Sequence, residues 1–273
     1  MTNPKTFPER ALTIAGFDPS GGAGVLADVR TFASFGFQAV AAVTSVTFQN
    51  TMAVLGATHQ TGEAVRAQVM SLMDDFRIVC LKIGMLPTRE VVLEVARLSR
   101  ETDLPQPVVD PVIQSSSGYP LMDERALDAL IKELLPMTRV LTPNIPEAEA
   151  LTGITITSET DMRQAAAIIR GMGARAVLIK GGHLGRQEAD GSRQTAGEST
   201  EPRSEEAIDV LDDDGKVTVF SERRILGAEL HGSGCLLSSA VAAGLGKGMT
   251  LEDSVGAAKS FVLEALRDST RQG

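Results

Sequence analysis

The run His231-Gly232-Ser233-Gly234-Cys235 has a serine between two glycines, and a cysteine follows the second glycine. Small and apolar residues follow with helical spacing, so the run predicts a tight turn into a helix. Its glycines allow successive backbone N–H groups to point into one concavity, and the helix start adds unpaired donors and the positive end of its dipole. Such a turn suits a bound or developing oxyanion, although a plain structural connector has the same pattern. Cys235 lies at the helix N-terminus, where a thiol is expected to be more acidic than a free one.

Three charged side chains stand at the ends of apolar strands or at the starts of helices. Asp110 directly follows two valines, where a carboxylate is costly unless it lies at the sheet edge or meets a cation. Lys180 ends an apolar strand and needs an anion, either a structural carboxylate or a ligand phosphate, and we favour the phosphate. Glu147, in the first turn of a helix, either complements the helix dipole or faces a bound metal.

Three further candidates lie in the first third of the chain. Gln49 comes at the end of a buried strand, where open parallel sheets bind ligands. Met85 follows another buried strand and either fills the core or lines a pocket. Asp28 lies early in a helix, where an acidic residue complements the dipole. The apolar spacing of that helix predicts that its core face consists of Val25, Leu26, Val29, Phe32 and Ala33.

Strands and helices alternate along most of the chain. The expected strands are 11–15, 38–46, 78–83, 107–112, 139–142 and 176–180. The expected helices between them include 63–76, 91–98, 124–135 and 161–172, and the last helix is 251–266. Short connections predict one domain, residues 1–273, of the α/β class with a mostly parallel sheet covered on both faces. Because parallel strands end at one edge of the sheet, the candidate residues are expected to meet there.

Two late segments depart from this alternation. Residues 208–211 and 217–220, joined across Asp213-Asp214-Gly215, predict an antiparallel hairpin that extends the sheet. Residues 186–206 contain no Val, Leu, Ile, Met or aromatic residue and are rich in carboxylates, Ser, Thr and Gly. Such a stretch cannot offset the entropy cost of ordering, so we predict a flexible polar insertion without a catalytic part.

The composition limits the classes of partner. Hydrophobic residues make up 43% and charged residues 22% of the 273 residues, as in ordinary globular proteins. A net charge of −9 argues against nucleic acid or an anionic membrane as the main partner. Two cysteines without a CxxC pattern do not form a zinc site and fit a reducing compartment. With no apolar leader or long apolar run, the expected location is the cytoplasm.

The familiar phosphate-binding motifs are absent from the sequence. A strand, a glycine-rich loop and a helix near the start look like the dinucleotide fingerprint, but the third glycine would fall at Ala27. No GxxxxGK[ST] motif occurs either. An NAD-dependent dehydrogenase is therefore disfavoured, and a nucleotide site must be built in another way.

The chain resembles bacterial hydroxymethylpyrimidine/phosphomethylpyrimidine kinases, which belong to the ribokinase-like superfamily. The matching stretches are LTIAGFDPSGGAG, ADVRTFASFG, TFQNT, LKIGML, VVDPV, LTPNIPEAEAL, VLIKGGH and HGSGCLLSSA, in the family's order over almost the whole chain outside 186–206. This resemblance implies a three-layer α/β/α ribokinase-like fold. It also implies a kinase of thiamine biosynthesis that uses ATP to phosphorylate 4-amino-5-hydroxymethyl-2-methylpyrimidine and then its monophosphate.

The resemblance further implies roles for individual residues. Those around the pyrimidine would be Asp28, Gln49, Met85, Val112 and Cys235. Those that bind ATP would be Asn144, Lys180, Gly182, Gly232 and Gly234, with Asp110 and Glu147 for Mg²⁺. Catalysis would involve Lys180, Gly232, Ser233, Gly234 and Cys235. A monovalent cation such as K⁺ is a further cofactor candidate, and a homodimer is expected.

Two departures and several alternatives stay open. Ser233 replaces the family's usual Thr, and Gln114-Ser115-Ser116-Ser117 stands where the family usually has a lysine that contacts phosphate. Cys235 either accepts the hydroxymethyl proton as a base or only lines the pocket. A pyridoxal or pyridoxine kinase of the same superfamily and a non-catalytic pyrimidine-binding protein are the alternative functions.

Overall fold

The computed structural model describes residues 7–50, 52–182, 206–223 and 231–271. In this part of the chain nine strands form one sheet, in the order β3-β2-β1-β4-β5-β6-β7-β8-β9. The strands are β1 (Glu9–Phe17), β2 (Ala39–Gln49), β3 (Val54–His59), β4 (Arg77–Ile83), β5 (Val108–Val109), β6 (Val140–Leu141), β7 (Ala176–Gly181), β8 (Glu206–Asp213) and β9 (Lys216–Arg223). The helices are α1 (Gly24–Ser34), α2 (Gly62–Asp75), α3 (Arg89–Glu101), α4 (Glu124–Ala129), α5 (Ile145–Thr152), α6 (Glu159–Gly171), α7 (Ser233–Gly246) and α8 (Leu251–Arg271).

The centre of the sheet is parallel and both edges are antiparallel. Strand β1 pairs in parallel with β2 and β4, and parallel pairing continues through β5 and β6 to β7. The predicted late hairpin is present as β8 and β9, joined by Asp214 and Gly215, which both have positive φ. Strand β3, which pairs antiparallel with β2, was not predicted. Its sequence VLGATH lacks a clear apolar alternation.

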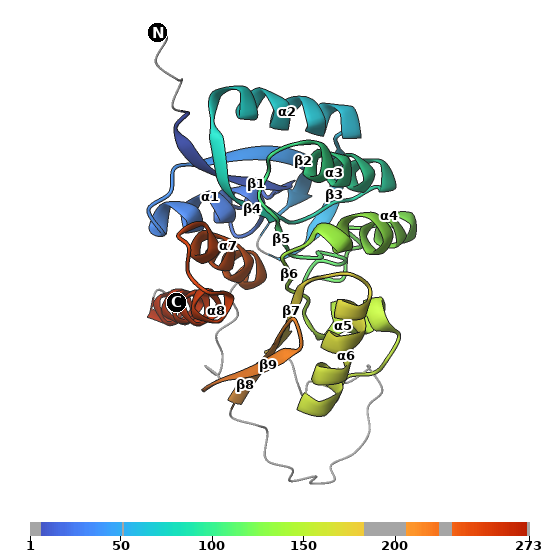
Figure 1. Cartoon of the computed structure of the whole chain (residues 1–273), viewed down its shortest axis with the longest axis vertical. Helices are drawn as coiled ribbons and strands as arrows, with labels where there is room; N and C mark the ends of the chain where they lie inside the picture. The colour runs from blue at the N-terminus through green and yellow to red at the C-terminus, as the bar shows by residue number, and fades with distance from the viewer. Residues whose placement is uncertain (1–6, 51, 183–205, 224–230, 272–273) are drawn as a thin grey trace.

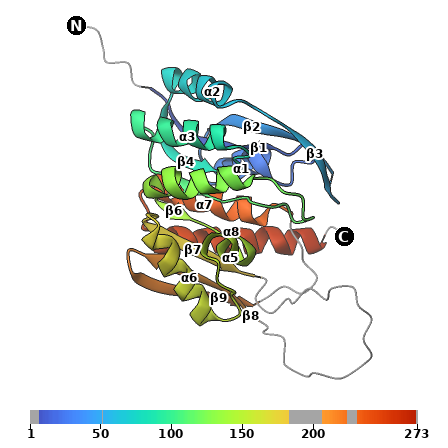
Figure 2. The same cartoon turned by 90° about the vertical axis from the view of Figure 1, so that its right-hand side faces the viewer.

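Two helical layers enclose this sheet (Figures 1 and 2). Helices α1, α7 and α8 cover one face, and α2 to α6 cover the other. Successive strand residues enter opposite cores, as the twofold periodicity of a strand requires: Leu81 packs with the second layer and Cys80 with the first. The three-layer α/β/α architecture is therefore confirmed. Cys80 is buried as expected, and burial raises the pKa of its thiol to about 12.

The predicted core face of α1 was only partly right: Val25 and Phe32 are buried, whereas Leu26, Val29 and Ala33 are not. The residues of α1 that the structure buries are Val25, Ala27, Asp28, Thr31 and Phe32. Leu26 is instead 37% exposed. The buried face includes two polar residues because both find hydrogen-bond partners in the interior, which removes the cost of burying them. A search for apolar spacing alone misses such a face.

The predicted helix 124–135 is also irregular. It begins as α4, continues as a π-helical turn over Leu130–Leu134 and ends in a 3₁₀ turn over Leu135–Met137. Pro136 lies in that last turn. A proline has no N–H group and cannot continue an α-helix, so the chain changes its hydrogen-bonding pattern here.

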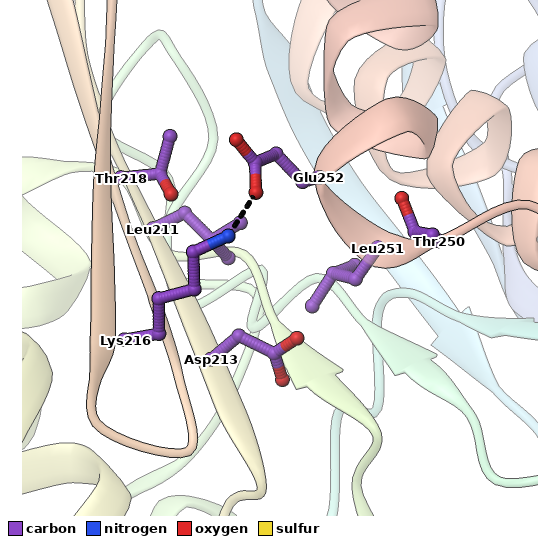
Figure 3. A pocket seen from close by; sticks show the side chains of 7 residues that line it. All are labelled: Leu211, Asp213, Lys216, Thr218, Thr250, Leu251 and Glu252. Atoms are coloured by element: carbon purple, nitrogen blue, oxygen red, sulfur yellow. Dashed lines mark hydrogen bonds and ion pairs between the residues drawn. The ribbon is translucent and has the colours of Figure 1, made fainter.

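A cavity of about 180 Å³ lies between the β8–β9 hairpin and the start of α8 (Figure 3). An ion pair of 2.5 Å between Lys216 and Glu252 crosses it. Asp213, another lining residue, pairs with Ala176 at the start of β7. This cavity is therefore at the opposite edge of the sheet from Lys180, which is near the end of β7. None of the described helices has the length and apolar content needed to cross a membrane.

Candidate active site

The predicted glycine turn leads into α7. Gly232 has φ 81° and precedes the first helical residue, and a Cβ there would overlap the carbonyl oxygen of Gly22. Gly234 lies close to the charged side chains: a Cβ there would be 3.1 Å from the Lys180 Nζ and 3.6 Å from Asp110 Oδ2. The first helical hydrogen bond runs from Leu236 N to Gly232 O at 3.0 Å. The preceding N–H groups therefore have no partner inside the helix and are available to an anion.

Lys180 and Asp110 form an ion pair beside this turn. The Lys180 Nζ donates to Asp110 Oδ1 at 2.8 Å, and the two side chains are 15% and 4% exposed. The structure thus gives Lys180 the carboxylate partner that was the less favoured alternative. Burial favours the neutral form of each group, but the opposite charge outweighs it and keeps the pKa of Asp110 low and that of Lys180 high.

Glu147 completes this charged cluster from the start of α5. Its carboxylate accepts from Asn144 N at 2.8 Å, and Asn144 Oδ1 accepts from Glu147 N at 2.8 Å, which makes a capping box. Burial raises the pKa of Glu147 to about 7, against the nearby Lys180 ammonium and with a contribution from the Asp110 carboxylate. A cation between the two carboxylates would relieve this repulsion.

Asp110 and Glu147 therefore fit a magnesium ion. Carboxylate oxygens suit Mg²⁺, which commonly takes one or two carboxylates in a protein and keeps several waters. Three or more His, Cys, Asp or Glu residues do not cluster as a metal site anywhere in the described ranges. The donor set thus favours a hydrated ion shared with substrate phosphates over a closed protein cage.

The expected acidity of Cys235 was wrong for this structure. Burial raises the pKa of its thiol to about 11, although the Lys82 ammonium and a hydrogen bond from the Gly24 backbone favour the thiolate. The carboxylates of Asp28 and Asp110 add to the rise. Loss of water and two acidic neighbours therefore outweigh the helix N-terminus.

Sequence reasoning missed the partner of Asp28. Lys82, in β4, is completely buried and its Nζ lies 2.9 and 2.8 Å from the two carboxylate oxygens of Asp28. Thr13 and Ser239 donate to the same carboxylate at 2.6 and 2.7 Å. Although burial favours the neutral amine, the Asp28 charge raises the pKa of Lys82. A lone lysine within the apolar run of residues 78–83 was the available signal.

This network bears on the expected role of Asp28. Each of its oxygens already accepts two hydrogen bonds, and the side chain is 0% exposed. A carboxylate offers about four acceptor positions, so none is left for a pyrimidine amine in this arrangement. Asp28 therefore has the environment of a structural residue.

The other residues expected around the pyrimidine come from three segments. Gln49, at the end of β2, lies 3.3 Å from His231 through its side-chain nitrogen. The carbonyl of Met85 accepts from Thr44 Oγ1 at 2.7 Å, and its sulfur lies against Gly16, where a Cβ would be 2.9 Å away. Val112 is half-buried two residues after Asp110.

The remaining candidates flank the charged cluster. Asn144 pairs with Lys180 in an isolated parallel bridge, and Lys180 N donates to Pro143 O at 2.9 Å. Gly182 is exposed in the turn after β7. Gln114, in the segment that lacks the family's lysine, donates to Gly118 O at 2.7 Å. The structure thus brings the glycine turn, Lys180, Asp110, Glu147 and Asn144 to one edge of the sheet.

These features define the class of the protein. A mostly parallel sheet between helical layers, with a glycine turn into a helix and a lysine–carboxylate cluster at its carboxyl edge, is the arrangement of a ribokinase-like kinase. The fold agrees with solved structures: phosphomethylpyrimidine kinase from Clostridium difficile has a TM-score of 0.77 and 34% identity, covering 96% of this chain and 100% of that chain. A pyridoxal kinase from Staphylococcus aureus, in complex with AMP-PCP and pyridoxal, has a TM-score of 0.80 and 28% identity, covering 96% of this chain and 88% of that chain.

Sequence similarity identifies the family. Residues 18–273 match the family described as phosphomethylpyrimidine kinase. The hydroxymethylpyrimidine/phosphomethylpyrimidine kinase of Streptomyces coelicolor is 41% identical over 263 residues, which are 96% of this chain and 90% of that protein. The chain belongs to the phosphomethylpyrimidine kinase family and is a kinase, as the resemblance of its motifs predicted.

Proposed function

We propose that this kinase transfers the terminal phosphoryl group of ATP to 4-amino-5-hydroxymethyl-2-methylpyrimidine and then phosphorylates the monophosphate, as a step of thiamine biosynthesis. The observation that carries the proposal is the glycine turn at Gly232–Gly234 packed against the Lys180–Asp110 pair. The names of similar proteins support the substrates, and the AMP-PCP bound to the related pyridoxal kinase supports an adenine nucleotide.

Transfer of the phosphoryl group depends on how the protein positions the reacting groups and stabilises their charge. Phosphoryl transfer has a loose transition state, so the protein mainly orients the groups and stabilises negative charge on the transferred oxygens. The N–H groups at the start of α7 and the Lys180 ammonium supply that charge stabilisation. Lys180 donates to Asp110 in the described structure. A bound phosphate would therefore either replace Asp110 as the acceptor or accept from Lys180 together with it.

Magnesium is the proposed metal. Asp110 and Glu147 would hold it, in part through waters, as their burial and mutual repulsion favour a cation between them. A bound Mg²⁺ neutralises charge on the phosphate oxygens. Binding of the ion also requires Glu147 to lose the proton that burial favours.

The pyrimidine site would be lined by Gln49, Met85, Val112 and Cys235. The Gln49 amide offers a donor and an acceptor that match an aminopyrimidine. Asp28, which has no open oxygen, would support this site from behind through Lys82 and Ser239. Cys235 would be protonated in the resting enzyme, because its pKa of about 11 lies far above neutral pH.

One assay tests the proposed function. ADP release is measured with hydroxymethylpyrimidine, its monophosphate and pyridoxal, each with and without Mg²⁺. We expect Mg²⁺-dependent turnover with both pyrimidines, at higher kcat/KM than with pyridoxal. Preferred turnover of pyridoxal would assign the enzyme to the alternative kinase, and ADP release with none of the three would support a binding protein.

A substitution tests which part of the site binds the pyrimidine and which part binds ATP. Gln49→Ala is expected to raise the KM for the pyrimidine by about tenfold, since a lost hydrogen bond in a buried site costs on the order of 1–2 kcal/mol. The KM for ATP should stay unchanged. Gln38→Ala, at an exposed position directly before the same strand, is the matched control. A raised ATP KM with an unchanged pyrimidine KM would show that the two sites are assigned in reverse.

We also propose a cytoplasmic homodimer. The two cysteines are free thiols, which fits a reducing compartment. Strand β3 is an edge strand, and near it Phe48, Met52 and Leu55 are 54%, 83% and 75% exposed. Apolar side chains gathered at an exposed edge favour association with a second copy. Light scattering of the wild type and of Leu55→Lys would measure the molar mass, and a monomeric wild type would contradict the dimer.

A further inference from the structure

His231, the residue directly before the glycine turn, has a side chain that two other segments reach at the same atom. Its Nε2 lies 3.1 Å from Asp18 Oδ2 and 3.3 Å from Gln49 Nε2. Asp18 belongs to the loop before α1, and Gln49 ends β2. One imidazole nitrogen therefore connects the proposed pyrimidine residue with the two glycine-containing loops of the site.

Asp18 is fixed as an acceptor. It is 4% exposed, and its carboxylate accepts from Ser20 N at 2.8 Å, Ser20 Oγ at 2.7 Å and Ala23 N at 2.9 Å. Burial favours the neutral acid, but these bonds and the one from His231 keep the pKa of Asp18 below its ordinary value. The carboxylate shapes the loop that leads into α1, and it is ionised at neutral pH.

The two contacts at Nε2 compete. A ring nitrogen of neutral histidine either donates or accepts, and the nitrogen of a glutamine amide only donates. With a proton on Nε2, the ring donates to Asp18 and faces the Gln49 amide with like polarity. Without that proton, it accepts from Gln49 and faces the Asp18 carboxylate with its lone pair. One of the two contacts at Nε2 is therefore repulsive unless Gln49 turns its amide or moves to another partner.

The ring also touches the glycine turn through packing. A Cβ at Gly22 would overlap the His231 ring, and a Cβ at Gly232 would overlap the carbonyl oxygen of Gly22. The loop before α1 and the loop before α7 are thus in direct backbone contact next to this imidazole. A change in the hydrogen bond of His231 therefore acts where the oxyanion-binding turn begins.

We propose that His231 is a positioning residue that couples occupancy of the pyrimidine site to the order of the glycine turn. A pyrimidine that takes the amide of Gln49 removes the competing contact, and His231 then donates to Asp18 alone. That bond holds the loop at Gly22 against Gly232 and orders the N–H groups that stabilise the transferred phosphoryl group. The coupling rests on the proposed function, because Gln49 is assigned there to the pyrimidine.

Two substitutions separate the hydrogen bond from the packing. His231→Phe keeps a planar ring against Gly22 but removes the donor, and His231→Gln restores a donor of similar reach. We expect kcat to fall about 10- to 100-fold in His231→Phe, the range that a small misplacement of reacting groups costs. The KM for ATP should change little, and His231→Gln should recover most of kcat. His59→Phe is the control, since this exposed ring on β3 bonds only to Ser45 among the described residues.

NMR reports whether the Nε2 of His231 carries a proton. The chain has three histidines, so ¹⁵N-histidine NMR with His231→Gln as the assignment variant resolves the His231 ring. Addition of hydroxymethylpyrimidine without ATP should shift His231 Nε2 toward the donating state. The same addition to Gln49→Ala, at a pyrimidine concentration that saturates it, should find Nε2 already in that state and shift it no further.

The outcomes distinguish the coupling from the proposed function. An unchanged His231 signal on saturation with the pyrimidine, or full turnover by His231→Phe, would overturn the coupling while leaving the kinase assignment intact. Equal losses in His231→Phe and His231→Gln would also overturn it, because packing would then explain the effect. No ADP release from the wild type with either pyrimidine would contradict the proposed function instead.

Discussion

At Cys235, two physical effects act on the same thiol in opposite directions. A helix N-terminus and the buried Lys82 ammonium favour the thiolate, whereas loss of water and nearby carboxylates favour the thiol. The position of Cys235 in the first turn of a helix was predictable from the glycines around it. Its degree of enclosure was not, because the neighbouring groups lie in β4, in α1 and directly after β5, far away in the sequence.

The high pKa leads to a prediction for Cys235. The rate of its alkylation by iodoacetamide should keep rising well above pH 9, and Cys235→Ala should lower kcat less than about tenfold, since a positioned base contributes roughly 10²–10⁴. Mass spectrometry of the alkylated peptide gives the rate, and Cys80→Ala is the control. A larger loss of kcat, together with alkylation that levels off near pH 7, would identify a thiolate base.

Glu147 gives a prediction for the pH dependence of stability. Its folded pKa of about 7 exceeds its ordinary value of 4.5, so the folded state holds a proton that the unfolded state has already released. This contribution to stability is complete below about pH 4.5 and is lost as the pH rises to about 7. In EDTA at pH 8, Glu147→Gln should therefore be more stable than the wild type, on the order of 1–3 kcal/mol.

Urea unfolding at several pH values measures this effect. The difference between the wild type and Glu147→Gln should shrink toward pH 5. Glu124→Gln is the matched control, because Glu124 also lies in a first helical turn but is exposed. Parallel stability curves for the wild type and Glu147→Gln between pH 5 and 8 would contradict the raised pKa.

At the scale of elements, the sequence predicted the turns whose conformation is determined by the residues of the turn itself. The β8–β9 turn follows from Asp214 and Gly215, and the turn into α7 follows from Gly232. The buried face of α1 could not be predicted from the sequence of the helix. Asp28 is stabilised on that face by Lys82 of β4, which lies 54 residues away in the sequence. The ion pair of Lys180 with Asp110 was likewise not evident locally, because the two residues lie 70 positions apart in the sequence.

The Lys82–Asp28 pair fastens α1, β4 and α7 together, which gives a prediction for stability. Lys82→Met leaves the Asp28 charge buried without a counter-ion and should lower the free energy of unfolding by about 3–5 kcal/mol. Adding Asp28→Asn removes the charge. Its amide oxygen can accept from one of the Thr13 and Ser239 hydroxyls and its NH2 can donate to the other, so the double variant should recover most of the loss.

Urea unfolding measures both variants. Lys132→Met removes an exposed i,i+4 partner of Asp128 and should have no measurable effect on stability. If the double variant were as unstable as Lys82→Met, the cost would come from packing of the lysine chain rather than from the unpaired carboxylate.

At the scale of the whole molecule, the parallel sheet explains why candidate residues from distant parts of the sequence lie in one site. Asp110, Asn144 and Lys180 each follow or end a strand, and neighbouring parallel strands place them at one edge. This convergence was predictable from the alternation of elements. The contact between the loop before α1 and the turn before α7 was not, because no local pattern encodes it.

The proposed polar insertion gives a prediction at the same scale. Residues 186–205 lie outside the described residues, whereas Glu206, which we had included in the insertion, begins β8. Gly181 pairs with Ile208, so the two ends of the segment are adjacent strands that a short linker can join. Replacement of residues 184–205 by a six-residue Gly/Ser linker should leave kcat and both KM values unchanged. Stability should rise by about 1 kcal/mol, because a shorter loop loses less entropy.

Steady-state kinetics and urea unfolding check this replacement. A Gly/Ser segment of the original length is the control that separates length from sequence. A large loss of turnover in the short variant, with turnover kept in the long one, would show that the reach of the segment matters. Loss of turnover in both would give its sequence a part in the reaction.

Helix α7 has one further consequence, for synthesis on the ribosome. It packs against α1, α8, β4 and β5, and its residues from Leu237 to Gly244 are all buried. Yet it is translated only after more than 230 residues have emerged. Until then the nascent chain has an exposed apolar surface on that side of the sheet. This surface includes Ala11, Cys80 and Val108, which pack in the same core cluster as α7 in the folded protein. Such a surface invites chaperone capture, and it stays exposed to aggregation until α7 packs onto the sheet.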